Sequence, residues 1–263
     1  MCFRRLTLLF VAIQQGPVCS PDAPPSLRFG PEPESDGSYG SRPNGGGGAG
    51  GVAANTEGMT GGHGGSYGTA GELGFSSLRL GSTTRRAPAY GDPGLATLFF
   101  GSGGGGGGNS WNSSANPVVQ AQPSGYGVGG AGGGLIFISA ATLVNQGTIT
   151  ADGANGSNGY LHGAGTCAQA IMGGGGGGGA GGSIRIQAVA GIGGVVSAEG
   201  GAGGSAIAYC YQSWTTAPIG GAGGSGRVRV QTGGGFSLAI VDVNTVRLVS
   251  SGPTATAQLV VKE

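Results

Sequence analysis

Runs of consecutive glycine constrain the fold of this chain more than any other feature of its sequence. Residues 101–108 and 173–182 are almost entirely glycine, and each run leads toward a segment with a different composition. Ordering glycine costs more backbone entropy than ordering any other residue. A folded chain with such runs therefore needs backbones that pack closely without side chains, or it must place its glycines in tight turns and loops.

The overall composition argues against disorder and against two other classes of protein. Glycine makes up 66 of 263 residues, whereas an average protein has about 7% glycine. Disordered chains combine high net charge with low hydrophobicity, but this chain has a net charge of +1 and 38% hydrophobic residues. A strict Gly-X-Y collagen repeat is absent. Nucleic-acid binding needs a basic patch, and the near-zero charge excludes nucleic acid as an expected partner.

An internal repeat begins after Gly129. In its first copy, Leu135–Ile138 is followed by the segment Gly147–Gly153. In the second copy, Ser183–Ile186 is followed by Gly194–Gly200, and a third copy starts at Arg227. The strand starts are 48 and 44 residues apart. Internal repeats decide the fold when they are present, so we expect each copy to form one structural unit.

The repeated segments alternate between apolar and polar residues, as half-buried strands do. In Ser183–Gln187 the isoleucines would face inward, while Arg185 and Gln187 would face outward. No segment shows a helical period with caps. The sequence thus predicts an all-β fold, a right-handed parallel β-helix or solenoid with glycine-rich loops. An antiparallel β-sandwich is the alternative that the repeat spacing disfavours. The run 173–182 would return a wide loop to the next strand, and polyglycine II segments are one form that such packed runs could take.

Composition divides the chain into five parts. Residues 1–20 have a basic start and a short apolar run, which fits a secretory signal; a misassigned start or a buried N-terminal strand would also explain them. Residues 21–42 are an irregular leader, and 43–134 form a glycine-rich N-terminal region. Residues 135–233 hold the β-helical repeats. Residues 234–263 lose the glycine, and their expected strands 236–241, 245–250 and 257–262 would form a cap.

The order of motifs also resembles a family. The phrase Ala89–Pro93 is followed by Phe100-Gly101-Ser102 and a glycine run, then by an alternating strand and the turn Gly147–Gly153. Over about residues 45–235, this order is similar to that of the large glycine-rich secreted repeat proteins of environmental bacteria. The resemblance implies a β-helical surface or extracellular module. The glycine runs are also similar in composition to the polyglycine II bundles of phage tail-tip adhesins and springtail antifreeze proteins.

The motifs that could carry chemistry have simpler explanations. Residues 221–226 match G-x-G-x-x-G, but a dinucleotide site needs a helix after the motif, and here a strand-like segment follows. His63 and His162 lie in glycine-rich stretches without convergent partners and are expected to be loop residues. Asp152 and Glu199 occupy equivalent positions in successive repeats; they could attract Ca²⁺, although a solvated turn is the favoured interpretation. We therefore expect no catalytic residue, no metal site and no cofactor.

Two groups of loop residues are the candidate sites. Cys167 and Cys210 lie in corresponding loops of the two repeats, where they would form a disulfide in an oxidising compartment or remain unpaired thiols. Aromatic residues gather in the same loops, where they would either form a recognition surface or cover glycine-lined backbone. These aromatic residues are Tyr160, Tyr209, Tyr211 and Trp214.

The sequence predicts a non-enzymatic protein, secreted or located at the cell surface, with a structural or adhesive role. Its partners would be cell-surface polysaccharide or other surface proteins. The alternative is a module that recognises polysaccharide or ice. A β-helix polysaccharide lyase is disfavoured because Lys262 is the only lysine. The apolar run Leu6–Ile13 is too short to cross a bilayer, which takes about 20 residues, so no transmembrane span is expected. The oligomeric state is left open.

Overall fold

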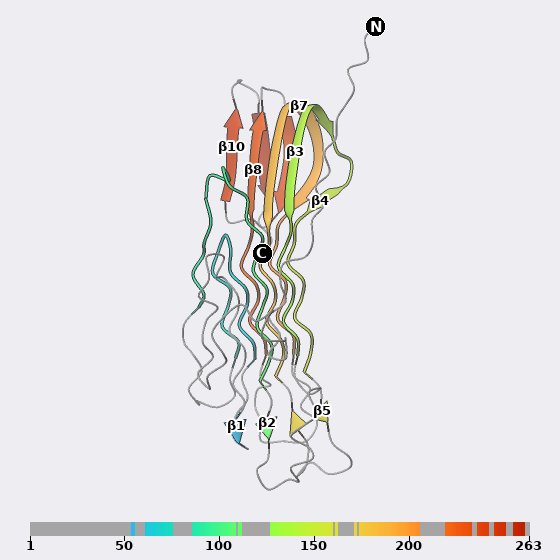
Figure 1. Cartoon of the computed structure of the whole chain (residues 1–263). Coiled ribbons are helices and arrows are strands. Elements are labelled where there is room, and N and C mark those ends of the chain that lie inside the picture. Colours follow the sequence, from blue (N-terminus) through green and yellow to red (C-terminus); the bar gives the residue numbers. More distant parts are fainter. Residues whose placement is uncertain are drawn as a thin grey trace.

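A computed structural model gives the fold (Figure 1). It describes residues 54–55, 61–75, 86–108, 110–111, 127–159, 161–162, 171–172, 174–205, 219–232, 236–241, 245–250 and 255–260. Every regular element within these ranges is a strand, so the all-β prediction is confirmed. The fold has two parts: a sheet at one end, and a bundle of undulating chains that continues from the strands toward the other end (Figure 1).

The main sheet is built from parallel strands of successive repeats. Strand β3 (Leu135–Val144) pairs with β7 (Ser183–Ser197), and β7 pairs with β8 (Arg227–Thr232). Leu135 is opposite Ser183, and Ser183 is opposite Arg227. This register confirms the alignment of the three repeat starts. Because neighbouring strands run in parallel, the sheet does not have the antiparallel pairing of the sandwich alternative.

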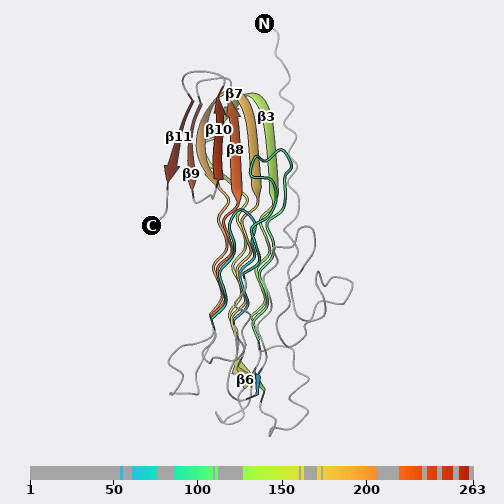
Figure 2. The ribbon, with the colours of Figure 1, turned by 90° about the vertical axis from the view of Figure 1, so that its left-hand side faces the viewer.

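The remaining strands extend the same sheet. Strand β4 (Thr148–Thr150) pairs with the end of β7, where Thr148 is opposite Val195 as the repeat alignment predicts. Strands β9 (Phe236–Val241) and β10 (Thr245–Ser250) begin and end where the sequence predicts strands, and β11 (Ala255–Val260) starts two residues before its predicted start. Strand β10 pairs with β8, while β9 pairs with β7 and β11 with β9, all in parallel. Figure 2 shows β9 and β11 as a layer beside β8 and β10.

The second repeat differs from its expected division into separate segments. In the sequence, Ser183–Ile186 and Gly194–Gly200 are two successive parts of the repeat, but β7 is one continuous strand of 15 residues. Its first half pairs with β3 and β8, and its second half pairs with β4 and β9. The register with β9 shifts between Ile192 and Val195. A bulge bends a strand and increases its twist. Such a bend lets the two halves of β7 pair with different neighbouring strands.

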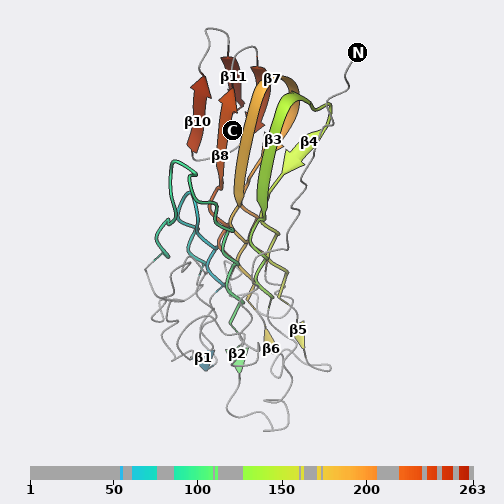
Figure 3. The same ribbon diagram turned by 45° about the horizontal axis from the view of Figure 1, so that its top comes forward.

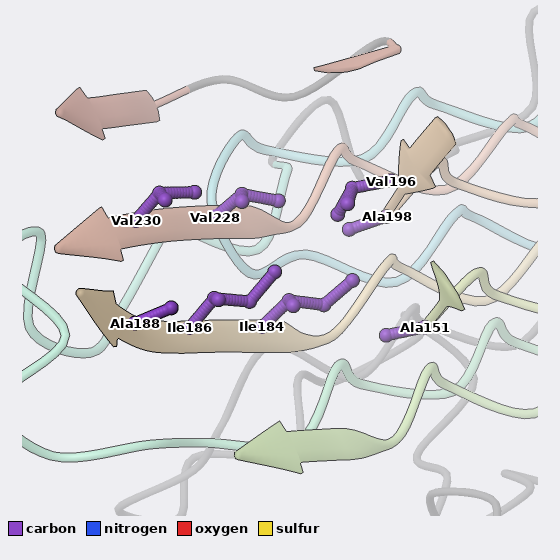
Figure 4. Packing of buried hydrophobic residues seen from close by; sticks show 8 residues of the cluster. All are labelled: Ala151, Ile184, Ile186, Ala188, Val196, Ala198, Val228 and Val230. Carbon is purple, nitrogen blue, oxygen red and sulfur yellow. The ribbon is translucent and has the colours of Figure 1, made fainter. Parts of the chain in front are cut away.

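Aliphatic side chains from the two halves of the sheet form a narrow core. Ile184, Ile186, Val228 and Val230 are fully buried on β7 and β8. Val196, Ala198 and Ala151 complete the cluster together with Ala188 (Figure 4). The alternation expected for β7 is therefore confirmed, since Arg185 on the opposite face is only partly buried. Burying an isoleucine or valine contributes about 1.5–3 kcal/mol.

Extended chains without regular secondary structure continue from the sheet and lie side by side (Figures 1 and 3). We call them rods and name each by its residues. Rods 127–134, 174–182 and 219–226 lead into β3, β7 and β8, while rods 151–159 and 198–205 lead away from β4 and β7. The other described rods are 61–66, 69–75 and 101–108.

Rod 174–182 is the centre of this bundle. Along it, backbone N–H groups of every third residue donate to the same neighbour: those of Gly174, Gly177 and Ala180 donate to rod 101–108. Donated and accepted bonds of 2.7–3.0 Å join the central rod to six others, namely 61–66, 101–108, 127–134, 151–159, 198–205 and 219–226. These six are also bonded to one another in a closed ring in that order. The arrangement is hexagonal, and its three-residue period is that of the polyproline II helix.

Close packing explains the glycine content of the rods. A Cβ atom on Gly178 would lie 1.9 Å from the carbonyl oxygen of Gly201, and one on Gly179 would lie 2.0 Å from that of Ala131. No real side chain tolerates such contacts. The central rod, surrounded on all sides, accordingly has a single non-glycine residue, Ala180. Residues 199–205 of rod 198–205 and the residues of rod 219–226 instead follow a Gly-Gly-X pattern. The X residues, one in three, are exposed or partly exposed.

Short strand pairs lie at the end of the bundle away from the main sheet (Figure 1). Strand β1 (Ala54–Asn55) pairs in parallel with β2 (Ser110–Trp111). Strand β5 (Leu161–His162) pairs with β6 (Ile171–Met172) and forms the only antiparallel pair among the described strands.

Candidate functional site

The candidate loop sites lie outside the part of the chain that the structure describes. This applies to both cysteines, Cys167 and Cys210, and to the aromatic residues Tyr160, Tyr209, Tyr211 and Trp214. Their pairing and recognition roles therefore stay predictions. The structure does locate the ends of the described rods that these loops connect. Ser205 and Ile219 end their rods at the far end of the bundle, and residues 206–218 join them.

The most elaborate group of side chains is instead at the junction of bundle and sheet, where a segment of irregular structure crosses β7 and β8. We call residues 86–100 the strap. Three arginines of the sheet donate to its backbone carbonyls. Arg227 Nη1 donates to Tyr90 O at 2.6 Å and Arg229 Nη1 donates to Gly94 O at 2.5 Å. Arg185 Nη1 donates to Leu95 O at 3.2 Å.

Arg227 and Arg229 are two residues apart on β8, and Arg185 of β7 is directly opposite Arg229. Because side chains two residues apart share a face of a strand, all three lie on the face opposite the aliphatic core. Sequence reasoning predicted this outward face but missed its function in holding the strap. The Arg-Val-Arg-Val pattern of β8 was the available signal. Guanidinium groups suit this task, because they stay charged and offer several donors in a fixed plane.

Aromatic rings and hydroxyl groups fix the strap to Tyr67, which directly follows rod 61–66. The rings of Tyr67 and Tyr90 have centroids 5.2 Å apart, and Phe99 packs edge-on against Tyr90 at 6.2 Å. The hydroxyls of Tyr67 and Ser183 are 2.5 Å apart, and Ser183 Oγ also donates to Phe99 O at 2.7 Å. Tyr90 in turn donates to Phe100 O. The strap thus joins the rod, the sheet and the bundle through one hydrogen-bonded cluster.

Burial sets the ionisation of this cluster. It raises the pKa of Tyr67, and it raises that of Tyr90 to about 12, against the smaller opposing effect of the Ser102 hydrogen bond. The carboxylate of Asp92 accepts from the N–H groups of Gly94 and Ala96 at 2.8 and 2.6 Å. These backbone bonds lower the pKa of Asp92. Burial thus favours the neutral, hydrogen-bonding form of both tyrosines. The Asp92 carboxylate fixes a turn of the strap.

The backbone of the strap also contains an unusual conformation. Leu95 has φ 50°, in the left-handed region that bulky residues rarely adopt. Such a conformation costs on the order of 1–3 kcal/mol. The side chain of Leu95 is 1% exposed and its carbonyl receives the Arg185 bond, so burial and hydrogen bonding offset the strain.

A second group of side chains borders the bundle. Asp152, Asn155 and Asn158 follow one another at every third position of rod 151–159. We call these three residues the Asx ladder. Their side-chain oxygens accept from backbone N–H groups of rod 198–205, at 2.7, 2.8 and 2.8 Å, in the pairs Asp152–Glu199, Asn155–Ala202 and Asn158–Ser205.

The same device recurs on two other rods. His63 Nδ1 accepts from Gly74 N at 2.7 Å, and Ser66 Oγ accepts from Gly71 N at 2.9 Å. On rod 69–75, Thr69 Oγ1 accepts from Ser225 N at 2.8 Å. Sequence reasoning missed these ladders. A three-residue spacing of polar side chains between glycines was the signal that could have revealed them.

The remaining sequence candidates can be placed. His63 is buried in rod 61–66, which has no regular secondary structure. His162 lies in strand β5 and not in the loop expected for it. Asp152 accepts from Ser197 Oγ at 2.6 Å as well as from Glu199 N. It therefore connects successive repeats through the side chain of Ser197 and the backbone of Glu199. The glycines of 221–226 lead into β8, which confirms the strand expected after that motif.

The described residues form neither a metal-binding cluster nor a membrane-spanning helix. No group of three or more His, Cys, Asp or Glu side chains is placed to hold a metal ion among them. Over the same ranges, no helix has the length and apolar character needed to cross a membrane. Comparison of the whole chain with protein-family models, with curated proteins and with solved structures gives no match.

Proposed function

We propose that this chain is a non-enzymatic structural or adhesive module, secreted or displayed at the cell surface, in which a rigid glycine bundle carries recognition loops. The observation that carries the proposal is the hexagonal network of backbone hydrogen bonds around rod 174–182. A buried backbone polar group must find a partner, and here each rod finds its partners in neighbouring rods. The bundle is thus ordered along its length without a conventional side-chain core.

The rods belong, in this proposal, to the polyglycine II class. Their hydrogen bonds repeat every third residue, and neighbouring rods run both parallel and antiparallel to the central one. A helix with three residues per turn directs its N–H groups at intervals of about 120°, which suits hexagonal packing. At a rise of about 3.1 Å per residue, the nine-residue central rod would span about 28 Å.

The sheet, in turn, would be the short solenoid that the repeats predict. Parallel pairing of β3, β7 and β8 on one side, and of β4, β7 and β9 on the other, supports coils that advance by one strand spacing per repeat. Connections of this kind are right-handed in nearly all parallel sheets. Each coil would extend through its rods, which makes the glycine runs part of the repeat.

The loops at the far end would form the recognition surface. The segment 206–218 contains Tyr209, Tyr211 and Trp214, and residues 160–173 contain Tyr160. Aromatic side chains are frequent anchors in binding surfaces. A disulfide between Cys167 and Cys210 would restrict the two loops in an oxidising compartment. The resemblance to secreted glycine-rich repeat proteins supports the same placement outside the cell.

Binding to immobilised polysaccharides tests the proposal. The comparison is between the unmodified chain, the triple variant Tyr209→Ala/Tyr211→Ala/Trp214→Ala, and the control Phe137→Ala, whose exposed ring lies on β3 at the opposite end. We expect saturable binding by the first and the third, and loss of binding by the triple variant. Undiminished binding by the triple variant would contradict the role of the loops. Cleavage of any polysaccharide would contradict the non-enzymatic assignment.

The second candidate function is polysaccharide recognition as the main role of the protein, in place of a structural role. The aromatic residues of the loops favour it. Ice recognition is less well supported. A regular threonine array would favour it, but Thr148 and Thr150 are opposite Val195 and Ser197 in the register. An ice-recrystallisation assay separates the two: we expect no inhibition, and clear inhibition would favour ice as the ligand.

A further inference from the structure

We propose that the Asx ladder closes one lateral edge of the bundle against a further glycine rod, and so prevents this face from associating with a second copy of the chain. The argument starts from the directions of the N–H groups of rod 198–205. Gly201 and Gly204 donate to the central rod. One residue further along at each point, Ala202 and Ser205 donate to Asn155 and Asn158 instead.

The N–H groups bound by the ladder point toward the place where a hexagonal array of rods would have its next rod. Successive residues of a three-residue helix point about 120° apart, so the N–H groups of Ala202 and Ser205 point away from the central rod. Rod 151–159 already bonds to the carbonyls of Glu199, Ala202 and Ser205. The ladder side chains therefore occupy the groove between these two rods on the outer surface, where the next rod of a hexagonal array would lie.

A comparable groove of the same bundle shows what fills such a position when it is open. Rod 69–75 rests against rods 61–66 and 219–226. Gly61 and Gly64 donate to Phe75 and Glu72, while Glu72 also donates to Ala222. A glycine-containing rod thus adds to the outside of the ring by backbone hydrogen bonds, together with side-chain bonds at His63, Ser66 and Thr69. The occupant expected at an unprotected edge is therefore another rod of this kind, which a second copy can supply.

The protection has the same physical basis as the protection of sheet edges. Unpaired N–H groups in a regular row form a template for another chain, and proteins block such rows with side chains. The ladder goes further than blocking, because each Asx oxygen satisfies one N–H group. Where rods of two copies meet head to tail without closing, growth continues into larger assemblies. Opening this edge should therefore produce association that increases with protein concentration.

Three double variants of the full chain separate the alternatives. Asn155→Gly/Asn158→Gly removes both the acceptors and the side chains. Asn155→Lys/Asn158→Lys removes the acceptors but fills the groove with charged side chains, and Asn155→Asp/Asn158→Asp keeps the acceptor oxygens. The measurements are sedimentation velocity over a range of concentrations and amide hydrogen exchange at Ala202 and Ser205. Exchange at Val228, within the core, reports whether each variant is folded.

We expect the glycine variant to associate, and the lysine and aspartate variants to stay in the same state as the unmodified chain. In dilute solution, exchange at Ala202 and Ser205 should become about tenfold faster in the glycine and lysine variants, and remain slow in the aspartate variant. A folded glycine variant that does not associate would overturn the proposal, as would equal association of the lysine variant. If the double glycine variant does not fold, the single variant Asn158→Gly and its partner Asn158→Lys give the same comparison at the end of the ladder.

Discussion

The guanidinium carbon of Arg227 lies 4.9 Å from the ring centre of Tyr67, and the same side chain donates to the carbonyl of Tyr90 at 2.6 Å. One residue of β8 thereby contacts both the turn after the first rod and the strap. Arg227 is 5% exposed, so its contacts are largely shielded from water. Charged hydrogen bonds and cation–π contacts are strongest when they are desolvated. This relationship places much of the stability of the junction on a single side chain.

Replacing this side chain should loosen the junction. The variant Arg227→Met removes the cation–π contact and the bond to Tyr90 O, and we expect it to lower the free energy of unfolding by about 2–3 kcal/mol. Exposed Arg86, at the start of the strap, supplies the control. Arg86→Met should change stability by less than about 0.5 kcal/mol. Urea denaturation checks both values, and equal effects of the two variants would contradict the role of Arg227.

Ionisation of Tyr90 should destabilise the protein at high pH. Its folded pKa of about 12 lies above the ordinary value of 10.0 because of burial. The neutral form is therefore favoured by folding. The corresponding stability is complete below pH 10 and is lost as the pH rises through about 12. Tyrosinate absorbance should show late-titrating groups, and the variant Tyr90→Phe should remove one of them. Titration of every tyrosine near pH 10 in the folded protein would contradict this expectation.

Adding one methyl group to the central rod should be far more damaging than adding it to a surface turn. In Gly178→Ala the new Cβ would meet the Gly201 carbonyl oxygen at 1.9 Å, whereas in Gly147→Ala the nearest atom is Asn145 Oδ1 at 3.9 Å. We expect the first change to cost more than about 3 kcal/mol or to prevent folding. The second should be neutral or slightly stabilising, because alanine restricts the unfolded chain. Thermal unfolding of the two variants provides the comparison.

Truncating side chains on the two faces of β7 should lower the stability of the protein by very different amounts. Ile186 is fully buried, and Val189 on the same strand is 63% exposed. Ile186→Ala should reduce stability by about 2–5 kcal/mol, because it removes buried methyl groups and leaves a cavity. Val189→Ala should have an effect of less than about 0.5 kcal/mol. Chemical denaturation followed by circular dichroism distinguishes these outcomes, and similar losses for both variants would show that the core is misplaced.

The alternating strands and their register could be predicted from the sequence, because a two-residue period and a repeat both leave a direct signature. Ser183, Leu135 and Arg227 align as the repeats indicated. The continuity of β7 could not be predicted, since Gly191 and Gly194 interrupt its run of side chains. The glycines of a strand give no sign of whether a bulge or a turn will follow.

The strap and the ladders show a different limit. Arg227 and Tyr90 are 137 residues apart in sequence, and no local pattern connects them. The Asx ladder, in contrast, does follow a local period of three, which strand and helix templates do not search for. Its members were visible in the sequence as Asp152, Asn155 and Asn158, but their partners depend on which rods become neighbours in the bundle.

A bundle packed through its backbone has thermodynamic consequences. Unfolding exposes peptide groups of the rods and comparatively little hydrocarbon, because Gly174 to Gly179 have no side chains to expose. Apolar exposure raises the heat capacity and polar exposure lowers it. The heat-capacity change per residue should therefore be smaller than in an ordinary globular protein, and the stability curve should be flatter. The free energy of unfolding of such a protein should vary little with temperature. Cooling should therefore lower its stability less than it lowers the stability of a fold held by a hydrocarbon core.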